Sequence, residues 1–376
     1  MELLVALALA VATVPQAPAR TGSSTTAAQL ERLIRDGKAD DAVKQGRPAV
    51  AAHPDDVDLR LALARALAAQ ARHANRQVDV TLSKDDTDRG QLTVKDADLR
   101  TATLRVDYNV ALLDEALAQL DVGIERTPKR LDLRVFQCFL LTDSGRIGSA
   151  KDAITSALSA LPKTPELAKT LTAYGAERAK RGDPAGAAEL FAPVASAFPD
   201  SAAILLDYAN VLTRLGRRNE AYDAFDRAIL LAPQDVRARR TKAIGAMLFR
   251  DYRRARSTFD AAFRLSNDRA DEFAAYAATY GLDPAVSASF MSEIASPAAA
   301  SEPAIVELAK AFARAGTSGA SSEDAMTLAR SLVESEQFVF AIPVLDRAVK
   351  ADSTNTEAKS MLQNAFRELG CKPPAP

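Results

Sequence analysis

The sequence predicts an all-α solenoid, a stack of two-helix hairpins, and three observations support this. Proline recurs at a 34-residue interval, from Pro128 to Pro162 and from Pro199 to Pro233, which is the period of a two-helix repeat. Glycine and alanine recur at fixed distances before these prolines, at Gly145, Gly182 and Gly216 and at Ala150, Ala187 and Ala221. The composition is 48% hydrophobic with only 16 glycines in 376 residues, as expected of a helical array.

Each landmark predicts one part of a hairpin. Glycine accepts the left-handed conformation that ends a first helix, and the alanine one turn into the second helix lets two helices approach closely. The residue four positions further, for example Phe225 after Ala221, lies on the same helix face and fills the gap between hairpins. Proline then ends the second helix, because it cannot continue the hydrogen-bond ladder.

The best-matched unit resembles the tetratricopeptide repeat family. Its landmarks are Leu205, Tyr208, Ala209, Leu212, Gly216, Ala221, Tyr222, Phe225, Ala228 and Pro233. Units with the same phase begin near Leu30, Cys138, Tyr174, Ala243 and Leu328, so the resemblance covers most of residues 24–353. It implies a right-handed α-solenoid of about seven or eight hairpins and a non-catalytic scaffold or adaptor that binds a protein or peptide.

The predicted organisation has five parts. These are a signal peptide at 1–19, an N-terminal and central solenoid at 20–280, a degenerate repeat and linker at 281–321, a C-terminal repeat and capping helix at 322–370, and a tail at 371–376. Pro284, Pro297 and Pro303 interrupt the degenerate part, which contains a helix at about 303–315. A capping helix at about 355–369 is expected to cover the open apolar end, as such arrays require.

The N-terminal segment predicts export to the periplasm or secretion, in a bacterial envelope. An apolar run at residues 3–14 precedes Ala17-Pro18-Ala19, and this order is typical of a signal peptide and its cleavage site. The run is too short to span a bilayer comfortably, so no stable membrane span is expected after cleavage. Glu2 stands where a basic residue is usual, and the alternative is an apolar first helix of a cytoplasmic protein.

A β-hairpin insertion is predicted at about 74–96, between a helix at about 56–72 and a long helix at about 97–127. Apolar residues alternate with polar ones at 78–82 and again at 92–94, on either side of a polar turn at 84–90, which is a hairpin pattern. The hairpin is expected to pack on its own helices, because an isolated one is marginal in water. The alternative is an edge strand that pairs with a strand of a partner.

Neither catalysis nor a bound cofactor or metal is expected. His53 and His73, the only histidines, are predicted at surface turns or helix ends, and Cys138 and Cys371 fall in a helix and in the tail. This arrangement offers neither a zinc site nor an activated nucleophile. The net charge of −1 argues against a general nucleic-acid binder.

The predicted binding surface consists of first-helix residues that the core pattern leaves unused. Five of these are polar or basic and two are apolar: Lys169, Asn210, Arg214, Arg237 and Arg240, and Val135 and Phe139. A partly basic groove beside an apolar pocket predicts an acidic protein segment with one apolar anchor. The alternative for Arg237 and Arg240 is that they are solvated or pair with neighbouring acids.

Two other functions remain open from the sequence. One is a cytoplasmic adaptor or co-chaperone-like protein, and the other is a helical-repeat regulatory subunit of an enzyme or nucleic-acid complex. The oligomeric state is not predicted.

Overall fold

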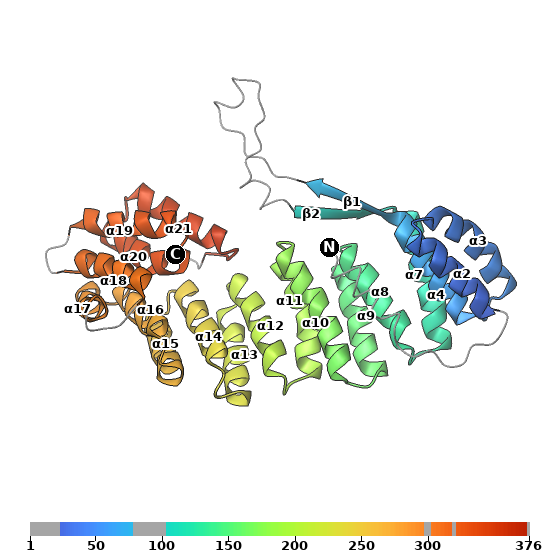
Figure 1. Ribbon diagram of the computed structural model, residues 1–376, viewed down its shortest axis with the longest axis horizontal. Coiled ribbons are helices and arrows are strands. Elements are labelled where there is room, and N and C mark those ends of the chain that lie inside the picture. The colour runs from blue at the N-terminus through green and yellow to red at the C-terminus, as the bar shows by residue number, and fades with distance from the viewer. Residues whose placement is uncertain (1–22, 78–102, 297–301, 318–320, 374–376) are drawn as a thin grey trace, which may run out of the picture. The chain divides into compact units, whose positions relative to one another are not determined.

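The computed structural model describes residues 23–77, 103–296, 302–317 and 321–373 (Figure 1). These residues form 18 α-helices and one two-stranded sheet, so the all-α solenoid prediction is confirmed. The chain divides into two compact units, residues 1–198 (unit 1) and residues 199–376 (unit 2). The predicted signal peptide at 1–19 lies outside the described residues.

The described part of unit 1 contains four helical hairpins and a β-ribbon. Its elements are α2 (Ser23–Arg35), α3 (Ala39–Ala52), α4 (Val57–Ala71), β1 (Arg72–Gln77), β2 (Thr103–Tyr108), α7 (Val110–Arg126), α8 (Leu131–Asp143), α9 (Ile147–Ala160), α10 (Pro165–Lys180) and α11 (Pro184–Ala197). Helix α2 packs against α3, α4 against α7, α8 against α9 and α10 against α11. We call α2, α4, α8 and α10 the first helices of unit 1 and the others its second helices.

The turns between helices form where glycine predicts them. Gly145 and Gly182 have φ of 78° and 79°, a left-handed conformation that costs little without a Cβ atom. Helices α7, α9 and α11 each end two residues before a proline, at Pro128, Pro162 and Pro199. Side-chain caps begin many of the helices; in α4, for example, Asp56 Oδ1 accepts a hydrogen bond of 3.0 Å from the Leu59 amide. Local chemistry therefore sets most of the helix boundaries.

Small residues let the helices of a hairpin approach closely. Ala150 and Ala187 are completely buried, and Phe191 is 1% exposed. A Cβ atom at Gly175 in α10 would lie 2.7 Å from Cδ2 of Phe191 in α11. The phenyl ring occupies the space that a larger residue in α10 would need, so Phe191 fills a gap within its own hairpin and not only the predicted gap between hairpins.

The β-ribbon differs from the prediction in its position. Strand β1 pairs antiparallel with β2, with Arg72 opposite Tyr108 and Gln77 opposite Thr103. The strands predicted at 78–82 and 92–94 and their turn at 84–90 lie outside the described residues. The helix predicted from about 97 begins only at Val110, because residues 103–108 form backbone hydrogen bonds to β1 instead of a helical ladder.

Unit 2 consists of helices throughout its described part. They are α12 (Ala202–Arg214), α13 (Arg218–Leu231), α14 (Val236–Leu248), α15 (Tyr252–Ser266), α16 (Arg269–Tyr280), α17 (Pro284–Ile294), α18 (Pro303–Ala315), α19 (Ser322–Glu334), α20 (Phe338–Ala351) and α21 (Thr356–Glu368). Three regular hairpins, α12–α13, α14–α15 and α16–α17, precede α18, and we call α12, α14 and α16 the first helices of unit 2. None of the helices in the described ranges combines the length and apolar character needed to cross a membrane.

Candidate protein-binding surface

Of the residues predicted in unit 1, two are accessible and one is not. On α8 Phe139 is half-buried, and on α10 Lys169 is exposed, whereas Val135 is only 5% exposed. The hydroxyl of Tyr174 in α10 donates a hydrogen bond of 3.0 Å to the main-chain oxygen of Val135. The two helices are therefore closely packed here, and the expectation that Val135 lines an open pocket is wrong.

Three aromatic side chains, Phe136, Phe139 and Tyr174, form a continuous set of ring contacts that we call the aromatic row. The rings of Phe136 and Phe139 stack with centroids 6.1 Å apart and planes inclined by 18°. Phe139 also meets Tyr174 at a centroid distance of 6.5 Å. Tyr174 is 3% exposed, while both phenylalanines are half-buried. The row thus has a buried anchor and two rings partly open to solvent.

An arginine extends the aromatic row to the preceding hairpins. The guanidinium carbon of Arg65 in α4 lies 5.8 Å from the centre of the Phe136 ring, within range of a cation–π interaction. Nη1 of Arg65 also lies 2.7 Å from Oε1 of Glu31 in α2. The contacts therefore connect all four first helices of unit 1.

Two lysines of α10 supply positive charge on the same side of that helix. Lys169 and Lys180 are both exposed, and neither forms an ion pair with a described residue. They are 11 residues apart, which is about three helical turns. Unit 1 therefore presents uncompensated cationic groups on a first helix of the aromatic row.

A buried carboxylate joins the β-ribbon to the first helices. The side chain of Asp143, at the end of α8, is 2% exposed. Its Oδ2 accepts hydrogen bonds from Tyr108 Oη at 2.7 Å and from Arg72 Nε at 3.2 Å, and Arg181 Nη1 lies 2.8 Å from its Oδ1. Burial and then the nearby carboxylate raise the pKa of Tyr108. This cluster fixes the base of the ribbon on α8.

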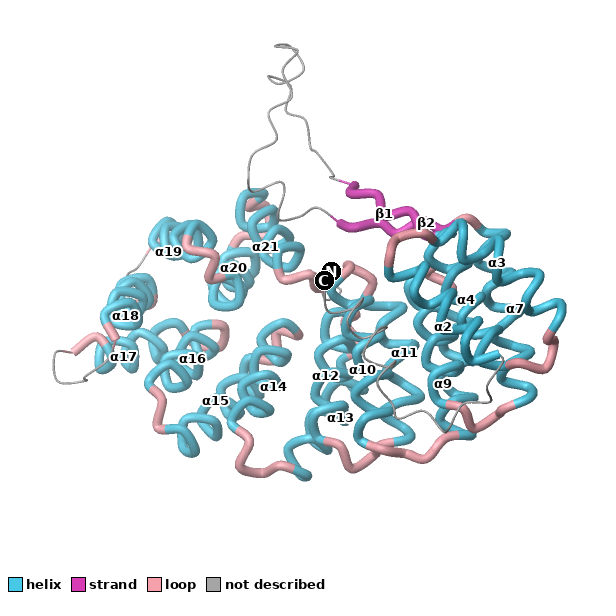
Figure 2. The backbone as a smooth tube through the Cα atoms, turned by 45° about the vertical axis from the view of Figure 1, so that its right-hand side comes forward, coloured by secondary structure: helices cyan, strands magenta, loops and turns pink. Residues whose placement is uncertain are grey.

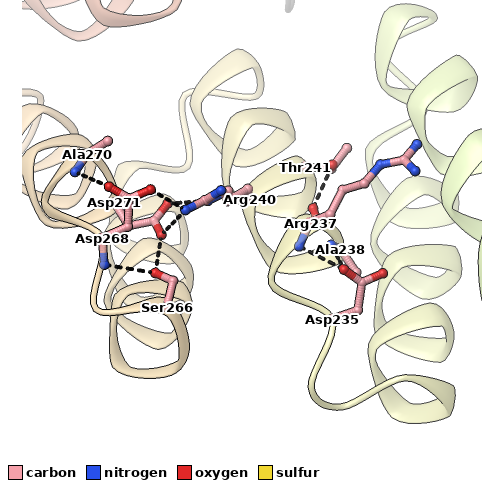
Figure 3. Close-up of polar contacts among 9 residues, drawn as sticks. All are labelled: Asp235, Arg237, Ala238, Arg240, Thr241, Ser266, Asp268, Ala270 and Asp271. Carbon is pink, nitrogen blue, oxygen red and sulfur yellow. Dashed lines mark hydrogen bonds and ion pairs between the residues drawn. The ribbon is translucent and has the colours of Figure 1, made fainter.

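The two predicted arginines of α14 have different environments. Arg240 Nε and Nη2 donate to Asp271 at 2.7 and 2.8 Å, and Nη2 also donates to Asp268 at 2.7 Å. These hydrogen bonds raise the pKa of Arg240. Figure 3 shows its guanidinium pointing toward these two carboxylates. Arg240 therefore pairs with neighbouring acids, which is the alternative prediction. Its charge is compensated and adds little to a basic surface.

Arg237 is open to solvent. Its side chain is 74% exposed, and Nη2 lies 3.9 Å from Oδ1 of Asp207 in α12. Burial raises the pKa of Asp207, although the charge of Arg237 opposes this. Figure 3 shows the side chain of Arg237 extending away from Arg240.

The two predicted residues of α12 also lie at the surface of unit 2. Asn210 is half-buried and Arg214 is exposed. The main-chain oxygen of Arg214 accepts a hydrogen bond of 2.9 Å from the amide of Lys372 in the tail. The C-terminal segment therefore lies against the end of α12.

Arg65, Phe136 and Tyr174 are absent from the predicted set, yet a sequence signal existed for one of them. Arg65 is the ninth residue of α4 and Phe139 the ninth of α8, so the two occupy equivalent repeat positions. Extending the pattern of Phe139 back by one unit would have identified Arg65.

The remaining candidates for chemistry are dispersed. His53 follows α3 and is exposed, while His73 lies in β1 and not at a helix end. Cys138 is buried, and Cys371 is half-buried. Within the described ranges, no three His, Cys, Asp or Glu side chains cluster in a way that could hold a metal ion.

Comparison with known proteins gives one family match. Residues 178–244 match the family model of the tetratricopeptide repeat. No curated protein matches the sequence.

Several solved structures are similar to the chain. One, on Pseudomonas aeruginosa pilF, has 15% identity, covers 65% of this chain and 91% of its own, and has a TM-score of 0.31. YrrB, described as a TPR protein with an unusual peptide-binding site, has 17% identity, coverages of 43% and 82%, and a TM-score of 0.30. A tetratricopeptide repeat protein from Parabacteroides merdae has 12% identity, coverages of 91% and 98%, and a TM-score of 0.30.

The family match spans the end of α10 through most of α14. Hairpins with glycine turns and buried alanines in the same phase precede it, at Gly145 and Ala150 for example. The chain therefore contains tetratricopeptide repeats at residues 178–244, and the hairpins before them share the same recurring pattern.

Proposed function

We propose that the chain is a non-catalytic scaffold that binds a protein segment on the first helices of unit 1. The tetratricopeptide repeat fold suggests a scaffold for protein–protein interaction. The observation that supports this location is the aromatic row, in which two half-buried phenyl rings stack beside the guanidinium of Arg65. Aromatic and arginine side chains are the residue types enriched at interface hot spots.

The charges beside the aromatic row favour an acidic partner with an apolar anchor. An apolar side chain of the partner would contact Phe136 and Phe139, while its carboxylates would approach Lys169 and Lys180, which are exposed. Burial of the anchor would supply most of the binding energy, and the lysines would set orientation and the association rate. In unit 2, Arg237 is the corresponding open cation, since Arg240 is bound to Asp268 and Asp271.

Site-specific photo-crosslinking tests this proposal. A benzoyl-phenylalanine replaces Phe139 in the full-length chain expressed in its source cells, and a matched chain carries it at Asp152, an exposed residue of the second helix α9. We expect one recurrent partner to crosslink through position 139 and not through position 152. Capture of the same partner through both positions, or only through 152, would contradict the proposed surface.

We also propose that the scaffold works in the envelope of a bacterium, in the assembly of an envelope or secreted complex. The support is the apolar run at 3–14 followed by Ala17-Pro18-Ala19, an order typical of a cleaved signal peptide. Mass spectrometry of the N-terminal peptide from fractionated cells tests this. A mature N terminus near Arg20 in the periplasmic fraction is expected, and an uncleaved chain in the cytoplasmic fraction would refute it.

A further inference from the structure

Helix α20 of unit 2 does not simply extend the row of hairpins. It packs against the first helices α14 and α16, as well as against α19 and α21, and Figure 2 shows α20 beside α16 and α14. The ring of Phe340 in α20 meets Phe273 of α16 edge-to-face, with centroids 5.2 Å apart. The capping helix predicted at about 355–369 corresponds to α21, whereas the helix before it, α20, covers part of the first helices of its own unit.

A buried carboxylate of α20 is bound by the turn between α14 and α15. The side chain of Asp346 is 2% exposed. Its Oδ2 accepts hydrogen bonds from Tyr252 Oη at 2.9 Å and from Lys350 Nζ at 2.8 Å, and Arg250 Nη1 lies 3.5 Å from Oδ1. We call Arg250, Tyr252 and Asp346 the C-terminal latch.

The backbone at Arg250 is strained. Its φ is 55°, and in the equivalent turns Gly182 and Gly216 have φ of 79° and 72°. A residue with a Cβ atom is disfavoured in this region, and such strain often marks a residue that is kept for its side chain. The guanidinium carbon of Arg250 lies 6.0 Å from the ring centre of Phe366 in α21, so this side chain contacts both of the last two helices.

The position of the Tyr252 ring also depends on the absence of a side chain at Gly281. A Cβ atom at Gly281 would lie 2.5 Å from Cδ2 of the Tyr252 ring. Only glycine leaves room for the ring in the orientation that brings its hydroxyl to Asp346. Two turns of unit 2 therefore accommodate the C-terminal latch. One contains Arg250 at positive φ, and the other contains Gly281, which has no side chain to clash with Tyr252.

We propose that α20 is an intramolecular occupant of the surface formed by α14 and α16, and that the C-terminal latch controls its release together with that of α21. In the closed state, Phe340 of α20 contacts Phe273 of α16, and the Asp346 carboxylate is bound by Tyr252 of α15 and by Arg250 in the turn before it. Release would expose the surface to an external segment with the same two groups. This regulation concerns unit 2 and is independent of the partner proposed for unit 1.

Hydrogen exchange measured by mass spectrometry on the full-length chain tests the proposal. Asp346→Asn removes the charge of the C-terminal latch, and Asp226→Asn, at a 58% exposed carboxylate of α13 paired with Lys242, is the matched control. We expect exchange in α20 and α21 and on α14 and α16 to rise at least tenfold in Asp346→Asn, with α12 and α13 unchanged. The control should match the unmodified chain.

A second variant separates latch opening from a failure to fold. Arg250→Gly removes the guanidinium but relaxes the left-handed turn, so the hairpin α14–α15 should remain folded. We expect hydrogen exchange in α20, α21, α14 and α16 to rise in this variant as it does in Asp346→Asn. Unchanged exchange in Arg250→Gly and Asp346→Asn, or equal acceleration of every helix of unit 2, would overturn the proposal, since α20 would then be an inseparable part of the core.

Discussion

Tyr108 donates a hydrogen bond of 2.7 Å to Oδ2 of Asp143 and so connects β2 to α8 across 35 residues of sequence. The same oxygen accepts from Arg72 in β1, and the carboxylate is almost completely buried. A two-stranded ribbon is marginally stable by itself. The solenoid therefore stabilises the base of the ribbon through this one carboxylate.

Tyr108→Phe is expected to destabilise unit 1 by about 1–2 kcal/mol, because it removes a partly buried hydrogen bond to a charged acceptor. Denaturant unfolding followed by circular dichroism measures the change. Tyr276→Phe is the matched control, since its hydroxyl makes a longer contact of 3.3 Å with Glu272 and should change stability by less than about 0.5 kcal/mol. Equal effects of the two variants would show that the Asp143 cluster adds nothing to stability.

Gly175→Ala tests the close packing of α10 on α11. The added Cβ atom would lie 2.7 Å from the Phe191 ring, so the ring must move, and we expect a loss of about 1–3 kcal/mol. Gly148→Ala in α9 is the control, because no atom outside its chain neighbours and the backbone of its own helix lies within 4 Å of its Cβ position. Alanine should there be neutral or stabilising by up to about 1 kcal/mol. Thermal unfolding of the two variants should therefore shift in opposite directions, and a shared direction would contradict this packing.

The loss of folding stability should be much larger for Arg240→Gln than for Arg237→Gln. Arg240→Gln leaves Asp271, whose side chain is 4% exposed, without its ion pair to Arg240, which is itself 39% exposed, and we expect this partly exposed pair to contribute about 1–2 kcal/mol to stability. Arg237→Gln acts on a side chain that is 74% exposed, so the effect should stay within about 0.5 kcal/mol. Urea midpoints of the two variants provide the comparison. Similar midpoints would show that the Asp271 pair is not structural.

Alkaline pH should destabilise unit 1 through Cys138. Burial raises the pKa of its thiol from 9.0 to about 12. Between these values the unfolded chain loses the proton and the folded chain keeps it, so stability falls as the pH rises above about 9, by up to about 1.4 kcal/mol per pH unit. Cys138→Ala should reduce the slope of unfolding free energy against pH in this window. An unchanged slope would mean that the thiol titrates normally in the folded chain.

The sequence predicted the hairpins well because their boundaries depend on local chemistry. A left-handed glycine such as Gly216, with φ of 72°, and a proline two residues beyond a helix end act within a few residues of the chain. The helix predicted at about 303–315 is α18, and the one predicted at about 355–369 is α21, Thr356–Glu368.

The misplaced elements depend on contacts between distant residues. Strand β1 is polar, with the sequence RHANRQ, so alternation of apolar residues could not identify it, and its pairing with β2 decides the conformation of 103–108. Helical phase correctly placed Phe139 on the surface, but it could not show that Tyr174 approaches Val135 closely enough to bury it. Nor could it show which aspartates approach Arg240, because they lie about 30 residues away on α16 and the turn before it.

A paired affinity measurement decides whether the aromatic row binds the partner. The partner captured through position 139 is titrated against Phe136→Ala/Phe139→Ala and against Leu230→Ala/Leu231→Ala, a control at two leucines that are 80% and 41% exposed. Circular dichroism first establishes that both variants remain helical. We predict that affinity falls about 30-fold for the phenylalanine variant, as loss of a hot spot of about 2 kcal/mol implies, and is unchanged for the control. Unchanged affinity of the phenylalanine variant would show that the partner does not bind at the aromatic row.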